Sequence, residues 1–307
     1  MSKEAKPTAS GSASRRTAVG VSLWERLVSA LRFPSRGREQ RAGIIRPAKQ
    51  VGLALSGGGA LGAAHIGVLE VLTAHGIRPY CVSGTSAGSA VGAVFCAGMS
   101  LALIKEVAMK LEWSQLGHVV RPRCGFFDGS RLEQFLIRLI GDRTFDQLYI
   151  PFACAAVDIL RDELIILREG RVAPAVRASC AFPGIFTPVE YGDRLLVDGG
   201  LINNMPVSIL YDMGADYTIA VDLSSPSYPR KAPTSLLETW FVSLSTLTRL
   251  THYEGALANV VIRPDIGEFN GFDLSHALIL IERGRAAAEA ALPKIMQDLG
   301  MEAEVAG

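Results

Sequence analysis

The chain has 307 residues, of which 49% are hydrophobic, and this length and composition allow one large buried core or two ordinary ones. Its five cysteines are scattered without a C-x-x-C pair, which argues against a disulfide framework and against a zinc site. The first residues lack an apolar segment followed by a small-residue cleavage site, so no secretory signal is predicted. We therefore expect a protein of a reducing compartment.

The net charge of +1 hides an asymmetry between the two parts of the chain. Residues 1–50 carry a net charge of +8, whereas residues 51–307 carry −7. A basic arm of this kind favours phosphate-bearing surfaces such as anionic lipid, and a solvated disordered tail is the alternative. Around 21–33 the arm contains Trp24 and three leucines on one helical face, which predicts a short amphipathic helix that lies in a membrane interface or packs on the globule or a partner.

Residues 79–104 contain no charged side chain and are numerous enough to span a bilayer. They include four glycines and several serines, however, and an amphipathic helical pattern follows them. A strand followed by a buried helix of small residues explains this stretch better than a membrane span does.

The remaining elements alternate between strands and helices. Such an alternation predicts a single α/β domain, a three-layer sandwich whose mostly parallel central sheet is covered by helices on both faces. We expect this domain over 50–300, after a partly disordered arm over 1–49 and before a tail over 301–307. The expected strands and helices are, in chain order, strand 51–56, helix 60–75, strand 78–84, a helix from 87 onward, hairpin 150–170, helix 172–178, strand 193–200, a helix after 206, strand 217–224, helix 235–253, strand 259–265 and helix 274–299.

The loop after the first strand has the spacing G-x-G-x-x-G, with glycines at 57, 59 and 62. This spacing at the start of a helix is typical of a dinucleotide site. The second strand, however, does not end in the acidic residue that would bind a ribose. It ends in Gly84-Thr85-Ser86-Ala87-Gly88, a G-x-S-x-G pattern at a strand-to-helix junction, which predicts a nucleophile elbow with Ser86 at its tip and Gly84 and Gly88 beside it.

With a nucleophile nearby, the glycine loop acquires another role. The amides of Gly57, Gly58 and Gly59 lie at the positive end of the following helix, where they could stabilise the oxyanion formed when Ser86 attacks a carbonyl. A serine also needs a base. Asp198 ends an apolar strand and is followed by Gly199 and Gly200, which permit close backbone approach. We expect Asp198 to be that base, although a D-G-G sequence alone can be a simple turn.

Four blocks in this order resemble the patatin-like phospholipase family, over about residues 50–299. Besides the glycine loop (57–62) and the elbow (84–88), they are the ASCAFPGIF segment (178–186) and D-G-G followed by N-N-x-P (198–206). Residues 125–136 are similar to the bacterial and neuropathy-target-esterase-like branch. The resemblance implies a Ser86–Asp198 dyad without histidine, the oxyanion glycines named above, no metal or other cofactor, and a phospholipid or lysophospholipid substrate.

Two other interpretations remain open at the level of sequence. An α/β-hydrolase triad would add His252 or His276 to Ser86 and Asp198, and a lipid- or protein-binding module would keep the fold without turnover. We expect no nucleic acid partner, a location in the cytoplasm or at the inner face of the membrane, and peripheral membrane contact through residues 1–49. The sequence does not indicate an oligomeric state.

Overall fold

The computed structural model describes residues 49–120, 124–224 and 232–301. The predicted amphipathic helix at 21–33, the basic arm around it and all but the first residue of the C-terminal tail lie outside these ranges, so the domain boundaries stay predictions. Within the described ranges, no helix is long and apolar enough to cross a membrane. The uncharged stretch at 79–104 folds as a strand and two helices instead.

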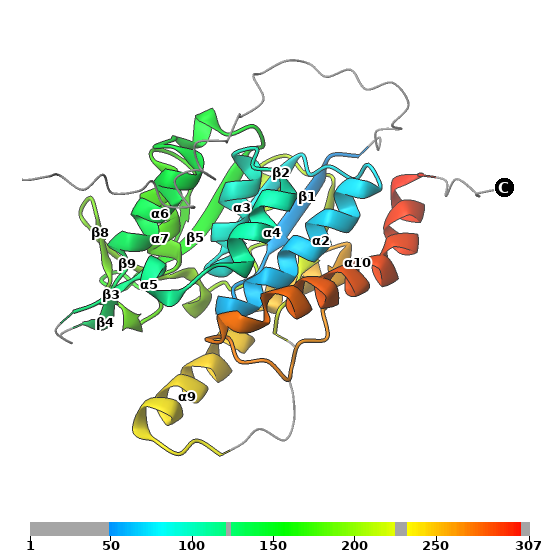
Figure 1. Ribbon diagram of the computed structural model, residues 1–307. Helices are drawn as coiled ribbons and strands as arrows, with labels where there is room; N and C mark the ends of the chain where they lie inside the picture. Colours follow the sequence, from blue (N-terminus) through cyan, green and yellow to red (C-terminus); the bar gives the residue numbers. More distant parts are fainter. Residues whose placement is uncertain (1–48, 121–123, 225–231, 302–307) are drawn as a thin grey trace, which may run out of the picture. The chain divides into compact units, whose positions relative to one another are not determined.

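The centre of the domain is a sheet of parallel strands that continues into an antiparallel edge (Figure 1). The parallel strands are, in spatial order, β11 (Val260–Ile262), β10 (Tyr217–Val221), β1 (Val51–Leu55), β2 (Cys81–Thr85) and β5 (Phe152–Asp158). The antiparallel ones are β6 (Glu163–Leu167), β9 (Arg194–Asp198) and β8 (Val189–Tyr191). The mostly parallel sheet and the hairpin predicted at 150–170 are confirmed.

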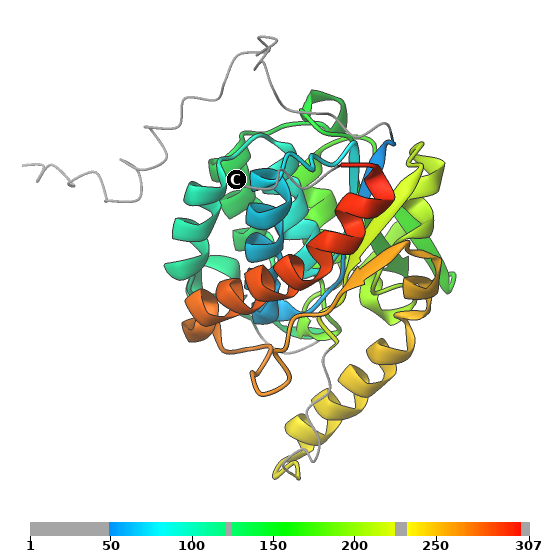
Figure 2. The same ribbon diagram turned by 90° about the vertical axis from the view of Figure 1, so that its right-hand side faces the viewer.

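Alternation of side chains along β1 sends its residues to the two faces of the sheet. On one face, the side chain of Leu55 lies next to Gly92 of helix α3 (Ala87–Cys96). On the other face, Ala54 packs in a buried cluster with Leu210 of helix α8 (Ser208–Asp212). Figures 1 and 2 show that the first face is covered by several helices. These are α2 (Ala63–Ala74), α3 (Ala87–Cys96), α4 (Leu101–Met109) and α10 (Ala277–Leu299), while the short α8 (Ser208–Asp212) packs on β1 and β2.

Several elements were not predicted from the sequence. A second sheet of three short strands joins β3 (His118–Val119), β4 (Gly125–Asp128) and β7 (Gly184–Phe186). The helix expected to continue from residue 87 stops at Gly98, whose φ of 86° suits glycine, and α4 begins after the N-cap Ser100. The helix predicted at 172–178 is present as α7 (Val172–Ser179). The remaining helices and turns are α5 (Trp113–Leu116), α6 (Ser130–Ile140), η1 (Gly59–Gly62), η2 (Phe145–Gln147), η3 (Gly199–Leu201), η4 (Tyr253–Leu257) and η5 (Leu274–His276).

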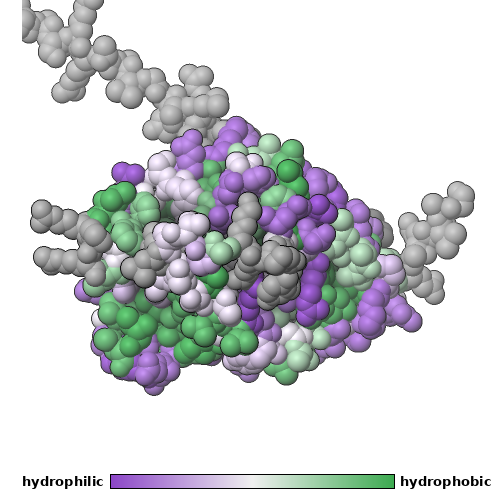
Figure 3. Space-filling view, turned by 90° about the horizontal axis from the view of Figure 1, so that it is seen from below, coloured by the Kyte–Doolittle hydropathy of each residue, from purple (hydrophilic) through white to green (hydrophobic). Residues whose placement is uncertain are grey.

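The long helix expected at 235–253 is α9 (Leu236–Leu250), which projects from the end of the domain where the parallel strands terminate (Figures 1 and 2). Figure 3 looks onto this end and shows apolar side chains gathered where α9 lies.

The closest helix packing in the domain joins α2 to α10. A Cβ atom at Gly284 of α10 would overlap the carbonyl oxygen of Ala64, and one at Gly67 of α2 would overlap that of Ile281. The two backbones therefore approach each other over glycine on both sides.

We expect Gly284→Ala to lower the free energy of unfolding by about 2 kcal/mol, because the new methyl group must push a backbone carbonyl aside. In an open helical position the same change would stabilise the protein by about 1 kcal/mol. Denaturant unfolding measures the difference, and Ala290→Gly on the exposed side of α10 is the propensity control. A Gly284→Ala protein as stable as wild type would contradict the close approach.

Candidate active site

Ser86 stands between β2 and α3 in a backbone conformation that an L-residue seldom adopts. Its φ is 51° and its ψ −123°, and within the described ranges only one other non-glycine residue, Asp162, has a positive φ. Such a conformation costs about 1–3 kcal/mol and persists only where the surrounding structure imposes it. The sharp turn lifts the Ser86 side chain above the end of the sheet, as the G-x-S-x-G pattern predicts.

Close packing of backbone explains the glycines of the elbow. A Cβ atom at Gly88 would overlap the carbonyl oxygen of Leu55 at the end of β1, and one at Gly84 would lie 2.6 Å from the carbonyl oxygen of Gly88. The two glycines therefore let the start of α3 lie directly against the ends of two strands.

The end of α7 holds the elbow and connects it to Asp198. The Ser86 N–H donates to the hydroxyl of Ser179 at 3.0 Å, and the thiol of Cys180 donates to the Ser86 carbonyl at 3.2 Å. The Asp198 N–H donates to the carbonyl of Ala181, also at 3.0 Å. Three consecutive residues thus contact both predicted members of the dyad. The sequence analysis quoted this segment but assigned no role to it.

Asp198 reaches the level of Ser86 on a strand that runs against the parallel ones. Its strand β9 pairs antiparallel with β5, which lies between β9 and β2, and Asp198 is opposite Ala156 while Thr85 is opposite Ala155. Asp198 therefore ends a strand of the same sheet as the elbow, as expected, but that strand is antiparallel to its neighbour β5. The register nevertheless brings the residue to the same edge.

The Asp198 carboxylate is buried, with 1% of the residue exposed. Its Oδ1 accepts the Gly200 N–H at 2.8 Å, while its Oδ2 makes no hydrogen bond of good geometry within the described ranges. Burial raises the pKa of this carboxyl group to about 6, and hydrogen bonding by the Ser86 hydroxyl and the Gly200 amide only partly opposes that rise. The group can therefore exchange a proton near neutral pH.

The glycine loop lies against Ser86 because β1 and β2 are neighbours. A Cβ atom at Gly57 would lie 3.1 Å from the Cβ of Ser86 and would overlap the amide oxygen of Asn204. The Gly57 N–H, predicted as an oxyanion donor, donates instead to the backbone carbonyl of Asn204 at 3.1 Å. The amides of Gly58 and Gly59 remain as candidate donors.

The two histidines of the alternative triad both contact residues other than Ser86 within the described part of the chain. The His252 Nε2 lies 2.6 Å from the Asn204 side-chain nitrogen, and its Nδ1 lies 2.9 Å from Asp222. His276 lies 3.2 Å from Asp273 and is absent from the cavity lining. His252, in contrast, lines the same cavity as Ser86 and Asp198.

The contact between His252 and Asn204 was not predicted from the sequence, which pointed to His252 only as a possible third member of a triad. Burial opposes ionisation of their neighbour Asp222, but hydrogen bonds and charge from His252 and Ser224 outweigh it and hold the Asp222 pKa well below its usual range. Asn204 belonged to the quoted N-N-x-P block, so its position was a usable signal. The sequence carries no comparable signal for His252, which is joined to Asn204 only by folding.

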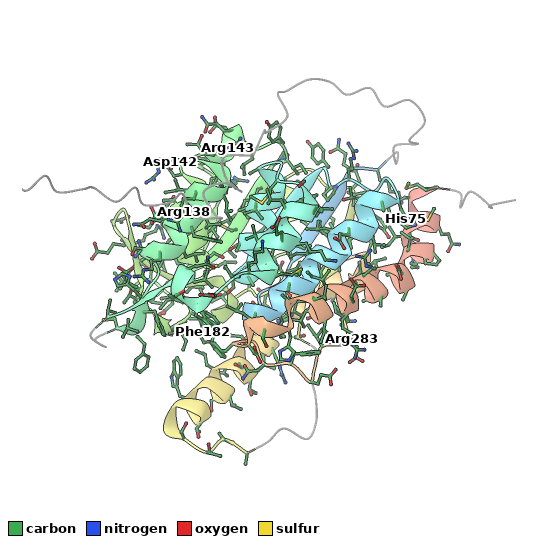
Figure 4. All side chains as sticks on the ribbon, in the orientation of Figure 1. His75, Arg138, Asp142, Arg143, Phe182 and Arg283 are labelled. Atoms are coloured by element: carbon green, nitrogen blue, oxygen red, sulfur yellow. The ribbon has the colours of Figure 1, made fainter. Side chains whose placement is uncertain are left out.

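Ser86 and Asp198 line a cavity of about 1280 Å³. Its other walls come from the glycine loop, from α9 and from segments with predominantly apolar side chains, among them Leu111, Leu132, Phe182, Ile185 and Phe269. Figure 4 labels Phe182, which lies at the end of the domain nearest α9. A cavity of this size and polarity fits a long apolar chain whose reactive group lies beside Ser86.

We expect Asp198→Asn to stabilise the protein at neutral pH but not in acid. Since the carboxyl pKa is about 6 in the folded state and near 4 in the unfolded chain, wild type loses stability as pH rises from 4 to 6, by about 3 kcal/mol in total. Asparagine does not titrate. Denaturant unfolding at pH 4 to 8 should therefore show a difference between the two proteins that grows with pH and levels off above 7.

The control for this experiment is Asp265→Asn, because the Asp265 side chain is 88% exposed. Its stability should differ from that of wild type by an amount that changes little from pH 4 to 8. If the difference in free energy of unfolding between wild type and Asp198→Asn were equally independent of pH, the pKa of the Asp198 carboxyl group would not be raised by folding.

Comparisons with known proteins agree with this geometry. An uncharacterized NTE family protein of Mycobacterium tuberculosis is 30% identical over 301 residues, covering 88% of this chain and 51% of the relative. Lysophospholipase NTE1 of Debaryomyces hansenii is 31% identical over 183 residues, which are 58% of this chain and 12% of that protein. The chain thus spans about half the length, or less, of these curated relatives.

Among solved structures, VipD from Legionella pneumophila superposes with a TM-score of 0.57 at 14% identity, over 88% of this chain and 73% of that one, which shows a shared fold. Residues 53–211 match the patatin-like phospholipase family. Because this match takes in more than half of the chain, including Ser86 and Asp198, the chain belongs to the patatin-like phospholipase family.

Proposed function

We propose that the chain is a serine acyl hydrolase that cleaves carboxylic ester bonds of lysophospholipids, phospholipids or related long-chain lipid esters. The observation that carries this proposal is the pairing of a strained serine with a buried carboxylate whose pKa is about 6, inside a large apolar cavity. The similarity to Lysophospholipase NTE1 of Debaryomyces hansenii supports a lysophospholipid substrate. We expect the activity in the cytoplasm or at the inner face of the membrane.

In the proposed reaction the Oδ2 of Asp198 accepts the proton of the Ser86 hydroxyl as its oxygen attacks the ester carbonyl. The amides of Gly58 and Gly59 stabilise the oxyanion that forms on the carbonyl oxygen, a contribution worth about 3 kcal/mol per donor. Asp198 then gives its proton to the departing alcohol, which leaves the acyl group on Ser86. A water molecule then attacks this acyl-enzyme while Asp198 takes one of its protons, and as the fatty acid leaves, that proton passes to the Ser86 oxygen and restores the hydroxyl.

We expect a fluorophosphonate probe to label wild type and to leave Ser86→Ala unlabelled, because only an activated hydroxyl attacks phosphorus. Fatty-acid release from lysophosphatidylcholine should fall at least a thousandfold in Ser86→Ala and in Asp198→Asn. In His276→Ala and His252→Ala it should fall less than tenfold. A larger loss in either histidine variant, with the fold intact by circular dichroism, would contradict the dyad and restore the triad.

The pH dependence of the wild-type reaction is a separate test of the base. Since Asp198 must be ionised to accept the serine proton, kcat/KM should rise about tenfold per pH unit below a pKa of about 6 and level off above it. The profile can be measured on a soluble p-nitrophenyl ester. A kcat/KM that is constant between pH 5 and 8 would contradict Asp198 as a base with a raised pKa.

Ser179 is expected to act as a positioning residue, since it contacts the backbone of Ser86 and not the reacting oxygen. Ser179→Ala removes the acceptor of the Ser86 N–H and should lower kcat about tenfold while changing KM less than twofold. Ser179→Thr keeps a hydroxyl and should restore part of the rate. Equal loss in the threonine and alanine variants would indicate that the site responds to packing alone.

A further inference from the structure

Helix α9 forms one wall of the cavity. Val242, Ser245 and Arg249 line it from one face of the helix. Trp240 is not on this face: near the start of the helix its ring meets that of Phe182 edge to face, with centroids 6.5 Å apart, and covers Gly184. The inner face of α9 thus belongs to the site that contains Ser86.

The opposite face of α9 is apolar and open to solvent. Trp240, Leu247 and Leu250 follow one another at i, i+7 and i+10, which places them on one side of a helix, and their exposed fractions are 36%, 59% and 74%. The turn η4 continues this surface with Tyr253 and Leu257, which are 59% and 50% exposed. We call these five residues the α9 face.

The α9 face contains few polar groups that need water. Between residues 239 and 257 only Arg249 and Glu254 are charged; Arg249 lines the cavity and Glu254 is buried. The exposed hydroxyls of Thr239, Ser243 and Thr246 donate to the carbonyls four residues earlier, at 2.8–2.9 Å. Because these hydroxyls are satisfied within the helix, moving them into an apolar layer breaks no hydrogen bond to the protein.

We propose that the α9 face docks into the interfacial layer of a lipid bilayer. The proposal rests on the proposed function, since it names the surface from which that site takes its substrate. Lipid is favoured over another protein as the partner of the α9 face because of where the helix lies. Its inner face lines the cavity that contains Ser86, and its outer face would contact the membrane from which a lipid substrate comes. With 15 residues, α9 is too short to span a bilayer, so it lies in the interface, where tryptophan and tyrosine are favoured.

The test uses the full chain and vesicles of phosphatidylcholine in 0.5 M NaCl. Neutral lipid and high salt suppress any contribution of the basic residues 1–49, for which we predict electrostatic contact with anionic lipid. Wild type should bind these vesicles, and Leu247→Ser with Leu250→Ser should weaken binding at least tenfold. Hydrolysis of soluble p-nitrophenyl butyrate should stay within twofold of wild type, because both changes leave the inner face intact.

The matched control replaces two exposed aromatic residues that precede β2 and β5, at the opposite end of the sheet. Tyr80 and Tyr149 are 44% and 39% exposed, and the protein with both changed to serine should bind vesicles as wild type does. Wild type that does not bind neutral vesicles, or a leucine double variant that binds within twofold, would overturn the proposal. So would a double variant that binds normally but changes from dimer to monomer by light scattering, since the α9 face would then be a contact between copies.

Failure of the proposed function gives a different result. Vesicle binding by wild type and its loss in the double variant do not depend on turnover. A protein that binds vesicles through the α9 face but releases no fatty acid would leave the docking surface in place and overturn the hydrolase. A protein that hydrolyses p-nitrophenyl butyrate but does not bind vesicles would leave the hydrolase in place and overturn the docking surface.

Discussion

The interaction between the Ser86 hydroxyl and the Asp198 carboxylate is the constraint on which the arrangement of the site depends. A buried carboxylate is costly to ionise, and among the residues that the structure describes only the Gly200 amide gives Asp198 a hydrogen bond of good geometry to offset that cost. Ser86 adds backbone strain on a neighbouring element. The buried charge of Asp198 and the strained backbone of Ser86 both lower the stability of the folded state. The favourable free energy that keeps the two residues in place must therefore come from the rest of the fold.

The surrounding structure meets this requirement through backbone contacts. The end of α7 binds Ser86 and Asp198 through the hydroxyl of Ser179 and the carbonyl of Ala181. On the other side Asn204 accepts the Gly57 N–H, while its side chain meets His252, which in turn lies beside Asp222. Backbone and buried side chains have few alternative conformations, so these contacts keep the reacting groups in one geometry.

The sequence predicts the parts of this site that depend on local structure. The elbow and the glycine loop each follow a strand directly, so their type and place can be read from a few adjacent residues. Three features needed the folded chain: the antiparallel direction of β9, the pairing of two-residue strands such as β3, and the contact of His252 with Asn204. Each depends on segments far apart in the sequence, and strands of two residues carry no periodic pattern.

The properties of Asp198 also explain how the proposed dyad would work without imidazole. An exposed carboxylate with a pKa near 4 is a poor base at neutral pH, whereas imidazole has a pKa near 6.5. Burial, partly opposed by hydrogen bonds from Ser86 and Gly200, brings the pKa of Asp198 to about 6, into the range of histidine, so a third residue would add little basicity. His252 is then left to support the glycine loop through Asn204. In the proposed reaction, the apolar surroundings that would admit a lipid chain are thus also what would make the carboxylate a competent base, which ties the proposed substrate to the proposed chemistry.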